Sequence, residues 1–200
     1  MQLLRIEQSD EAAKVLANAF ADDPLWLYLL PDVAERHKAL FCSFRATMPY
    51  YAYNDQVYGI DNPLEGVAIW QPPNARTRGW WTFINQYMLK LLFSPFMRAF
   101  PRVIPIFAQF DRMHKQYASA PHYYLSTIGV IPAAQGKGLA SQLIKPILAK
   151  ADAERYSVYT ETMTPSNVPL YEHYGFACQE KFEVPETRLS IWSLYRAARK

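Results

Sequence analysis

Cysteine is scarce in this sequence, and the patterns that mark secreted proteins are missing. The chain holds 2 cysteines, Cys42 and Cys178, which lie far apart and form no Cys-x-x-Cys pair, so a zinc or redox motif of that kind is excluded. Both lie in apolar patterns, which predicts that they are buried as small hydrophobic side chains. The first residues contain no basic stretch followed by an apolar core, which argues against a signal peptide.

Strong charge and long apolar runs are also absent. The formal net charge is only +3, and no Lys/Arg cluster alternates with aromatic residues, so nucleic acid binding is not expected. The longest apolar region, residues 87–96, contains Lys90 and Pro95 and is too short to span a bilayer. The histidines, His114 and His122 among them, are isolated and pair with no Cys or Asp at metal-ligand spacing. We therefore expect a cytoplasmic protein without a metal site and without membrane or nucleic acid partners.

The 200 residues, half of them hydrophobic, suffice for a sizeable core. Without repeats or low-complexity linkers, they predict one domain over residues 1–200, with a variable, helical, aromatic-rich segment at about residues 77–120. Ser9 or Asp10 is expected to cap the first helix, and Pro49 to end or kink the second. The order of elements predicts an α/β fold with a mixed sheet. The expected strands are residues 3–7, 56–60, 66–71, 123–128, 157–162, 178–183 and 189–195, and the expected helices lie at about 10–20, 31–52, 81–92, 104–117, 139–154 and 169–174.

One loop carries the strongest functional pattern in the chain. Residues 130–140 read Val-Ile-Pro-Ala-Ala-Gln-Gly-Lys-Gly-Leu-Ala, between an apolar, β-rich run and a helical pattern. Gly136 and Gly138 allow a tight turn and close approach of a ligand to the backbone. The first amides of a helix lack intrahelical partners and carry partial positive charge, so this loop predicts a phosphate or pyrophosphate site.

Two familiar phosphate-binding patterns do not fit this loop. A P-loop requires Gly-Lys followed by Ser or Thr, whereas Lys137 is followed by Gly138. A dinucleotide fingerprint requires a third glycine, and Ser141 stands in that position.

The pattern that fits is Gln-x-x-Gly-x-Ala with Pro132 upstream, together with a later segment, Asn-Val-Pro-Leu-Tyr-Glu-His-Tyr-Gly-Phe at residues 167–176. In this order and spacing the two segments resemble the GNAT acetyltransferase superfamily. That resemblance implies about seven mostly antiparallel strands with helices on both faces, and acetyl-CoA as the acyl donor. It implies that backbone of the strand pairs with pantetheine and that loop amides hold the pyrophosphate. The residues so implied are Ile128, Gly129 and Val130 for pantetheine, and Gln135, Gly136, Lys137, Gly138, Leu139, Ala140 and Ser141 for the pyrophosphate.

A closer likeness, weak over about residues 77–120, is to the branch of the superfamily that contains puromycin N-acetyltransferase. It rests on Ala-Phe-Ala-Asp-Asp-Pro at residues 19–24, Val-Ala-Ile-Trp at 67–70, Tyr-Leu-Ser-Thr-Ile-Gly-Val at 124–130 and Thr-Glu-Thr at 160–162. Because the weak region is where substrate choice is expected to lie, this likeness does not identify puromycin as the substrate.

The reaction implied is transfer of an acetyl group to the primary amine of a small molecule, by direct attack in a ternary complex. The resemblance makes Tyr171 the general acid for the thiolate, and the alternative is a tyrosine that packs a short helix on the sheet. Glu161 is the candidate base, since an acid in a β-rich run is costly unless paired or solvated; a strand-end carboxylate facing water, with a water path as base, is the alternative. Asn167 either contacts pantetheine or caps the short helix, and Lys137 either touches phosphate or is solvated.

Other functions remain open at this point. The acceptor is alternatively a protein or peptide, or the chain is a non-catalytic CoA-binding sensor. The aromatic residues, Trp26 among them, either line an acceptor pocket for an apolar or aromatic amine or belong to the core. The aromatic segment alternatively forms the face of a homodimer, or attaches to a membrane surface.

Overall fold

A computed structural model describes residues 1–61, 63–73, 75 and 94–199. The helix expected at residues 81–92 lies outside the described residues, as does much of the aromatic-rich segment. Among the described residues no helix is long and apolar enough to cross a membrane.

The described strands form one seven-stranded sheet in the order β1-β2-β3-β4-β5-β7-β6. All neighbours are antiparallel except β4 and β5, which run parallel. This confirms the mixed, mostly antiparallel sheet expected from the sequence. The strands are β1 (Gln2–Leu3), β2 (Val57–Ile60), β3 (Gly66–Gln71), β4 (His122–Val130), β5 (Ser157–Thr162), β6 (Ala177–Glu183) and β7 (Ser190–Arg196).

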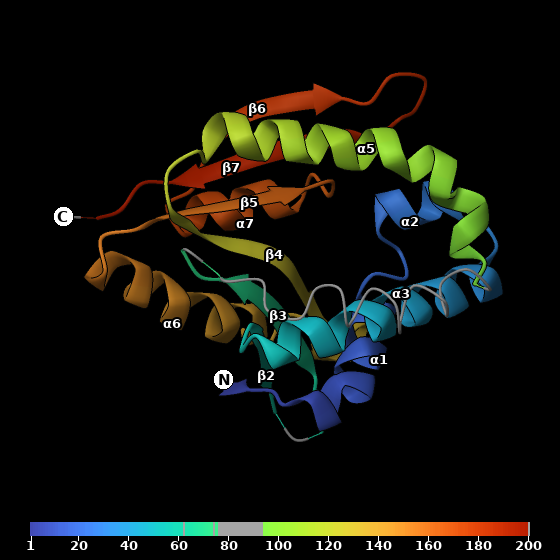
Figure 1. Ribbon diagram of the computed structural model, residues 1–200, viewed down its shortest axis with the longest axis horizontal. Helices are drawn as coiled ribbons and strands as arrows, with labels where there is room; N and C mark the ends of the chain where they lie inside the picture. Colours follow the sequence, from blue (N-terminus) through green and yellow to red (C-terminus); the bar gives the residue numbers. More distant parts are fainter. Residues whose placement is uncertain (62, 74, 76–93, 200) are drawn as a thin grey trace.

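Helices cover both faces of the sheet (Figure 1). Successive side chains of β3 point to opposite faces of the sheet, so Ile69 packs with α1 and α3 whereas Trp70 packs with α6. The buried Trp70 indole also donates a hydrogen bond to the Leu143 carbonyl oxygen of α6 at 3.2 Å. The helices are α1 (Ser9–Ala19), α2 (Pro24–Leu29), α3 (Val33–Tyr53), α5 (Phe96–Tyr117), α6 (Leu139–Ala153) and α7 (Asn167–His173), with short 3-10 helices η1 (Ile6–Gln8) and η2 (Pro132–Ala134).

The parallel pair β4 and β5 separates halfway along its length. Pairing runs from His122 opposite Ser157 to Leu125 opposite Thr160 and then stops. At this point the register of β3 against β4 skips Ser126, which is a bulge in β4. Beyond it, residues 127–130 pair with β3 alone, and Glu161 and Thr162 pair with β7 alone. The two strand edges that face each other here are therefore open to a ligand.

Four local expectations were wrong. The first strand covers only Gln2–Leu3, because the chain turns into η1 at Ile6. Neither Ser9 nor Asp10 caps α1: Gln8 holds the N-cap position, and the Asp10 carboxylate pairs with Arg45 instead. Pro49 does not end the second helix, since it lies inside α3, which continues to Tyr53. Cys178 is exposed, because β6 is an edge strand of the described sheet, and Cys42 is only partly buried.

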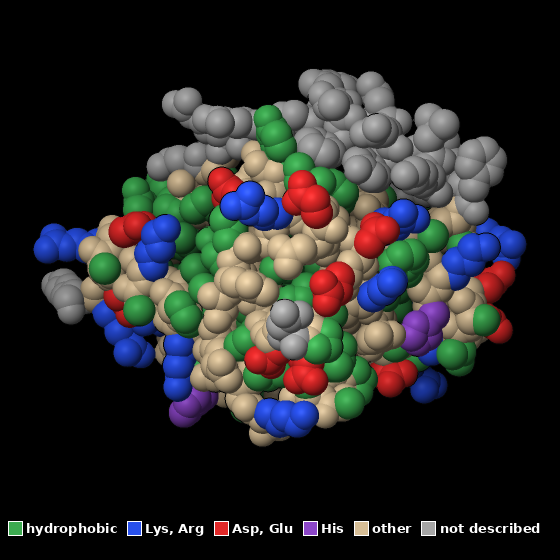
Figure 2. Space-filling model, turned by 90° about the horizontal axis from the view of Figure 1, so that it is seen from below, with side chains coloured by type: hydrophobic (Ala, Val, Ile, Leu, Met, Phe, Trp, Pro, Cys, Tyr) green, Lys and Arg blue, Asp and Glu red, His purple; other side chains and the backbone are tan. Residues whose placement is uncertain are grey.

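The surface mixes charges of both signs. On the face shown in Figure 2, Lys and Arg side chains alternate with Asp and Glu side chains and gather into no single-sign patch among the described residues. This distribution agrees with the low net charge of the chain.

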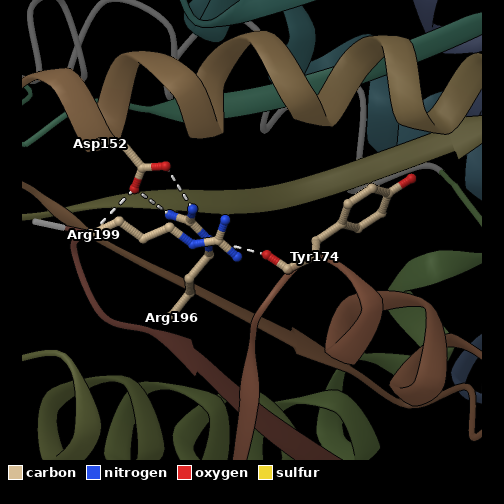
Figure 3. Close-up of polar contacts among 4 residues, drawn as sticks. All are labelled: Asp152, Tyr174, Arg196 and Arg199. Carbon is tan, nitrogen blue, oxygen red and sulfur yellow. Dashed lines mark hydrogen bonds and ion pairs between the residues drawn. The ribbon is translucent and has the colours of Figure 1, made fainter.

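A buried arginine ties together the elements that carry the later motifs (Figure 3). The Arg196 side chain, 3% exposed, makes paired hydrogen bonds to the Asp152 carboxylate of α6 at 2.7 and 2.6 Å. Its Nε donates to the Tyr174 carbonyl oxygen, at the end of α7, at 3.0 Å. Arg196 therefore joins β7, α6 and α7, and its hydrogen bonds lower the pKa of Asp152.

Replacing Arg196 should cost far more stability than replacing an exposed arginine. We expect Arg196→Leu to lower the free energy of unfolding by about 3 kcal/mol, because the Asp152 carboxylate and the Tyr174 carbonyl lose their partner. Arg45, half-exposed and paired with Asp10 at 2.8 Å, is the matched control, and Arg45→Leu should cost less than about 1 kcal/mol. Urea unfolding measures both values. Equal losses would mean that the Arg196 cluster does not hold the three elements together.

Candidate active site

The glycine loop between β4 and α6 has the geometry of an anion site. Gly136 and Gly138 both adopt positive φ, +78° and +80°, where side chains other than glycine are strained. No atom of the described chain lies within 4 Å of where a Cβ would stand at either position. Gly138 is the N-cap of α6 and supplies no side-chain cap, and the Gln142 amide donates to the Gly138 carbonyl oxygen at 3.2 Å. The amides of Leu139, Ala140 and Ser141 thus lie at a free, partly positive helix start.

Two side chains of this loop differ in their surroundings. The Gln135 side-chain amide donates to the Val130 carbonyl oxygen at 3.1 Å, so it braces the loop against the end of β4. Lys137 is exposed and is not part of the described cavity wall. The loop therefore lines the cavity through residues other than Lys137.

A cavity of about 530 Å³ opens in front of this loop. Its wall joins the open end of β4, the start of α6, the end of α1 and the helix α7. All of the sequence-predicted cofactor residues except Lys137 line it: Ile128, Gly129, Val130, Gln135, Gly136, Gly138, Leu139, Ala140, Ser141 and Asn167. Tyr171 lines it as well. Most of the motif residues therefore meet at one place.

A second cavity of about 290 Å³ meets the first. Glu161 lines only this smaller cavity. Together the two cavities form a continuous site on both sides of the gap between β4 and β5. The residues that both cavities share are Phe20, Asp23, Ile128, Asn167 and Tyr171.

Tyr171 is buried at the junction of the two cavities, with 4% of its surface exposed. Burial raises the pKa of Tyr171 to about 12, and a hydrogen bond with the Thr160 side chain partly opposes this shift. Its ring meets Phe176 edge-on, with the ring centroids 5.6 Å apart, so the Gly-Phe part of the motif fixes the tyrosine. The hydroxyl is therefore protonated and held in position near neutral pH.

Glu161 carries an ionisable group in an apolar setting. Its Oε1 is buried and has no hydrogen-bond partner among the described residues. Burial raises the pKa of Glu161 to about 7, while hydrogen bonds with the Tyr124 and Tyr159 hydroxyls partly oppose the shift. A carboxylate that titrates near neutral pH can accept and release a proton under working conditions.

The two histidines that the sequence left isolated lie in contact. The Nε2 atoms of His114, on α5, and His122, on β4, are 2.7 Å apart, and His122 Nδ1 lies 2.7 Å from the Ala120 carbonyl oxygen. Burial and the neighbouring His122 lower the pKa of His114 to about 4, whereas Asp111 opposes the shift. The neutral His114 ring stacks on Tyr159 at 4.7 Å. This pair therefore supports one of the two tyrosines that surround Glu161.

Asn167 and Asp23 stand at the wall shared by both cavities. The Asn167 side-chain amide donates to Thr162 Oγ1 at 3.3 Å, so it does not cap α7, whose N-cap is Ser166. The Asp23 carboxylate caps α2 by accepting from the Leu25 amide at 3.0 Å. Burial raises the pKa of Asp23. Hydrogen bonds from the Leu25 and Trp26 amides and with the Thr164 side chain oppose this shift.

Sequence reasoning missed Asp23, Tyr124 and Tyr159 as members of the site. Asp23 followed by Pro24 reads as a helix start, since Asp is a favoured N-cap and Pro a favoured first residue, and this signal was available. Tyr159 lies two residues before Glu161 on β5 and so on the same face of the strand, whereas Tyr124 on β4 reaches Glu161 only because β4 pairs with β5. Among the described residues, no group of three His, Cys, Asp or Glu side chains could hold a metal ion.

Comparisons with known proteins agree with this geometry. The family model "Acetyltransferase (GNAT) family" matches residues 106–176, which include β4, the glycine loop and α7. An uncharacterized N-acetyltransferase from Schizosaccharomyces pombe is 28% identical over 190 residues, which cover 90% of this chain and 76% of that protein.

Solved structures share the fold over the whole chain. The crystal structure "histone acetyltransferase HPA2 and related acetyltransferase" from Corynebacterium glutamicum matches with a TM-score of 0.66 at 20% identity and covers 100% of this chain and 96% of that one. Arylalkylamine N-acetyltransferase 2 from Aedes aegypti matches with a TM-score of 0.62 at 14% identity and covers 99% of this chain and 98% of that one. The family model and the yeast relative support the GNAT superfamily, and with the shared fold they identify the chain as an acyl-CoA-dependent N-acetyltransferase.

Proposed function

We propose that the chain, acting as one GNAT domain over residues 1–200, transfers the acetyl group of acetyl-CoA to the primary amine of a small molecule. The observation that carries this proposal is the meeting of two cavities at Tyr171. One contains the anion-binding loop, and the other contains Glu161. Donor and acceptor thus have separate cavities with a common wall, as direct attack in a ternary complex requires.

The larger cavity is the proposed acetyl-CoA site. Its residues fit the group, because the glycine positions leave free space in front of the α6 amides, where a pyrophosphate binds well. The open edge of β4 at Ile128, Gly129 and Val130 offers backbone groups to the pantetheine arm. When bound, acetyl-CoA supplies an acyl group activated as a thioester.

Glu161 is the proposed base. An alkylamine is mostly protonated near neutral pH and must lose a proton before it can attack. A carboxylate whose pKa is about 7 accepts that proton in its ionised form and returns it to water afterwards. A water path without Glu161 is the alternative.

Tyr171 is the proposed acid. Its pKa of about 12 keeps the hydroxyl protonated over the working range of pH. Because a thiol has a lower pKa, about 8.5, the phenol acts first as a hydrogen-bond donor that stabilises the thiolate. Its buried place at the junction of both cavities keeps bulk water from replacing it.

Two other functions are tested alongside the main one. A protein or peptide acceptor needs an open groove, whereas the described walls around Glu161 enclose a small cavity. A CoA-binding sensor would bind the cofactor without turnover. The likeness to the puromycin N-acetyltransferase branch, a cytoplasmic location and a homodimer are further proposals that rest on sequence alone.

The first experiment measures thiol release from acetyl-CoA with the purified chain. The panel contains arylalkylamines, polyamines, amino acids, a peptide and puromycin, and CoA binding is followed separately by the shift in melting temperature. We expect thiol release with at least one small amine and a thermal shift with CoA. Thermal stabilisation without turnover on any amine would contradict the transferase proposal and favour the sensor. Turnover on the peptide alone would contradict the small-molecule acceptor.

Removing the Tyr171 hydroxyl should slow catalysis without harming binding. We expect Tyr171→Phe to lower kcat at least tenfold, since the thiolate loses its donor, and to leave the Kd for CoA unchanged. Tyr156, which lies against Tyr123 outside both cavities, is the matched control, and Tyr156→Phe should keep the parental kcat. A Tyr171→Phe enzyme with unchanged kcat would reject the role of the acid.

Glu161→Gln should change the pH dependence of the rate. In the parent, Glu161 acts as a base only after it loses its proton, so kcat/KM should rise as the pH increases through about 7, the pKa of this carboxyl. In Glu161→Gln that step should disappear, while the rise that follows from the amine's own deprotonation remains. The surface variant Glu183→Gln serves as control, because Glu183 pairs with Lys181 on β6. Profiles of identical shape would assign proton removal to water.

A further inference from the structure

The walls of the smaller cavity are dominated by aromatic rings. Six of the rings come from the C-cap of α1 and from α2, α3 and α5, on the side of the sheet opposite α6. They are Phe20, Trp26, Phe44, Phe96, Phe107 and Phe110. Aliphatic side chains, among them Leu29 and Val103, fill the space between the rings. The cavity therefore suits an apolar, flat body.

These rings are held by their own packing. Trp26 on α2 meets Phe96 on α5 with centroids 5.7 Å apart, tilted by 41°. Phe20 meets Phe44 at 5.5 Å, tilted by 53°. Tilted pairs at this distance are favourable aromatic contacts, so the walls exist before a ligand binds.

The charged side chains in the described wall of the smaller cavity are all acidic. Its described wall contains two acids, Asp23 and Glu161, and no Lys, Arg or His. A ligand that carries a carboxylate or phosphate beside its amine would find no cationic partner among these residues, and burying such a charge unpaired is costly. Free amino acids are therefore poor ligands.

The two acids of this wall differ in the partners that they already have. The Asp23 carboxylate already accepts hydrogen bonds from the start of α2. By contrast, Glu161 Oε1 is buried without a partner among the described residues. A single ammonium group would pair with the Glu161 carboxylate, whereas the further ammonium groups of a polyamine would find no other acid except Asp23 in the described wall.

The size of the cavity limits the ligand to a small one. Its volume of about 290 Å³ lies at the lower end of the ~300–1,000 Å³ that is usual for ligand pockets. One aromatic ring on a short chain suits this space better than an aminonucleoside with several rings.

We propose that the smaller cavity is the acceptor site and takes a primary arylalkylamine, with its ring among the phenylalanines and Trp26 and its amine at Glu161. This inference rests on the proposed function and names its substrate class. The ammonium group gives one proton to Glu161, and the neutral amine forms the C–N bond as the thioester C–S bond breaks. The nitrogen then loses a second proton, which balances the one that the sulfur receives. The departing sulfur takes a proton through Tyr171, and the products are an N-acetylarylalkylamine and CoA.

Matched amines test the class. With the full chain, 2-phenylethylamine should show a kcat/KM at least tenfold above phenylalanine, which adds a carboxylate, and above spermidine, which adds charges. Calorimetry of the same amines in the presence of CoA should give the same order of affinities, independently of turnover. Equal or better binding and turnover of spermidine, phenylalanine, a peptide or puromycin would overturn the arylalkylamine assignment while leaving the transferase intact. No turnover of any amine would overturn the proposed function, whereas calorimetry would still decide whether the arylalkylamine occupies this cavity.

Variants of the cavity wall test where the amine binds. Trp26→Leu should weaken 2-phenylethylamine binding and raise its KM at least tenfold, while the thermal shift with CoA stays unchanged. Phe96→Leu provides a second variant of the same wall in case Trp26→Leu does not fold. The matched control is Trp192→Leu, because Trp192 on β7 lines neither cavity and contacts Lys181. Parental affinity for 2-phenylethylamine in both wall variants would place the amine elsewhere.

Discussion

The separation of β4 from β5 is the constraint on which the whole site depends. The two strands pair as far as Leu125 and Thr160, and the bulge at Ser126 turns the rest of β4 away. Without that bulge, β4 and β5 would go on pairing, and their edges would satisfy each other. Because they part, both cavities, the free edge of β4 and the Tyr171 hydroxyl meet at one gap.

The apolar rings around this gap also set its chemistry. Burial disfavours the ionised form of a carboxyl group, and it raises the pKa of Glu161 into the neutral range. The neighbouring tyrosines limit the shift by hydrogen bonding, and His114 holds one of them by stacking. The site thus joins apolar recognition and proton transfer, because one environment causes both.

Much of the fold follows from sequence patterns, and the exceptions have physical causes. The hairpin at residues 56–71, the strand before the glycine loop and the helix after it all lie where alternation and helical spacing place them. Pro49 does not end α3, because packing of the helix against α1 and the sheet outweighs one lost helical hydrogen bond. Cys178 was misjudged because an alternating pattern cannot reveal that a strand lies at the edge of a sheet.

The site was predictable where it depends on local sequence and unpredictable where it depends on strand order. The glycine loop and Tyr171 carry motifs, and both line the larger cavity. Tyr124 reaches Glu161 only because β4 pairs with β5, and His114 reaches His122 only because α5 lies beside β4. Such contacts join residues distant in sequence, and no spacing rule records them.

The position of β7 has a consequence for how the protein forms during synthesis. β7 lies between β5 and β6, although it follows every other described strand in the sequence. The nascent chain therefore cannot place β6 in the sheet, or close the Arg196 bonds to α6 and α7, until residues 190–196 have left the ribosome. Until then α7 lacks its anchor, and the exposed edge of β5 is open to wrong pairing. Completion of the site is accordingly a late step in folding, and chaperones have most to protect in this interval.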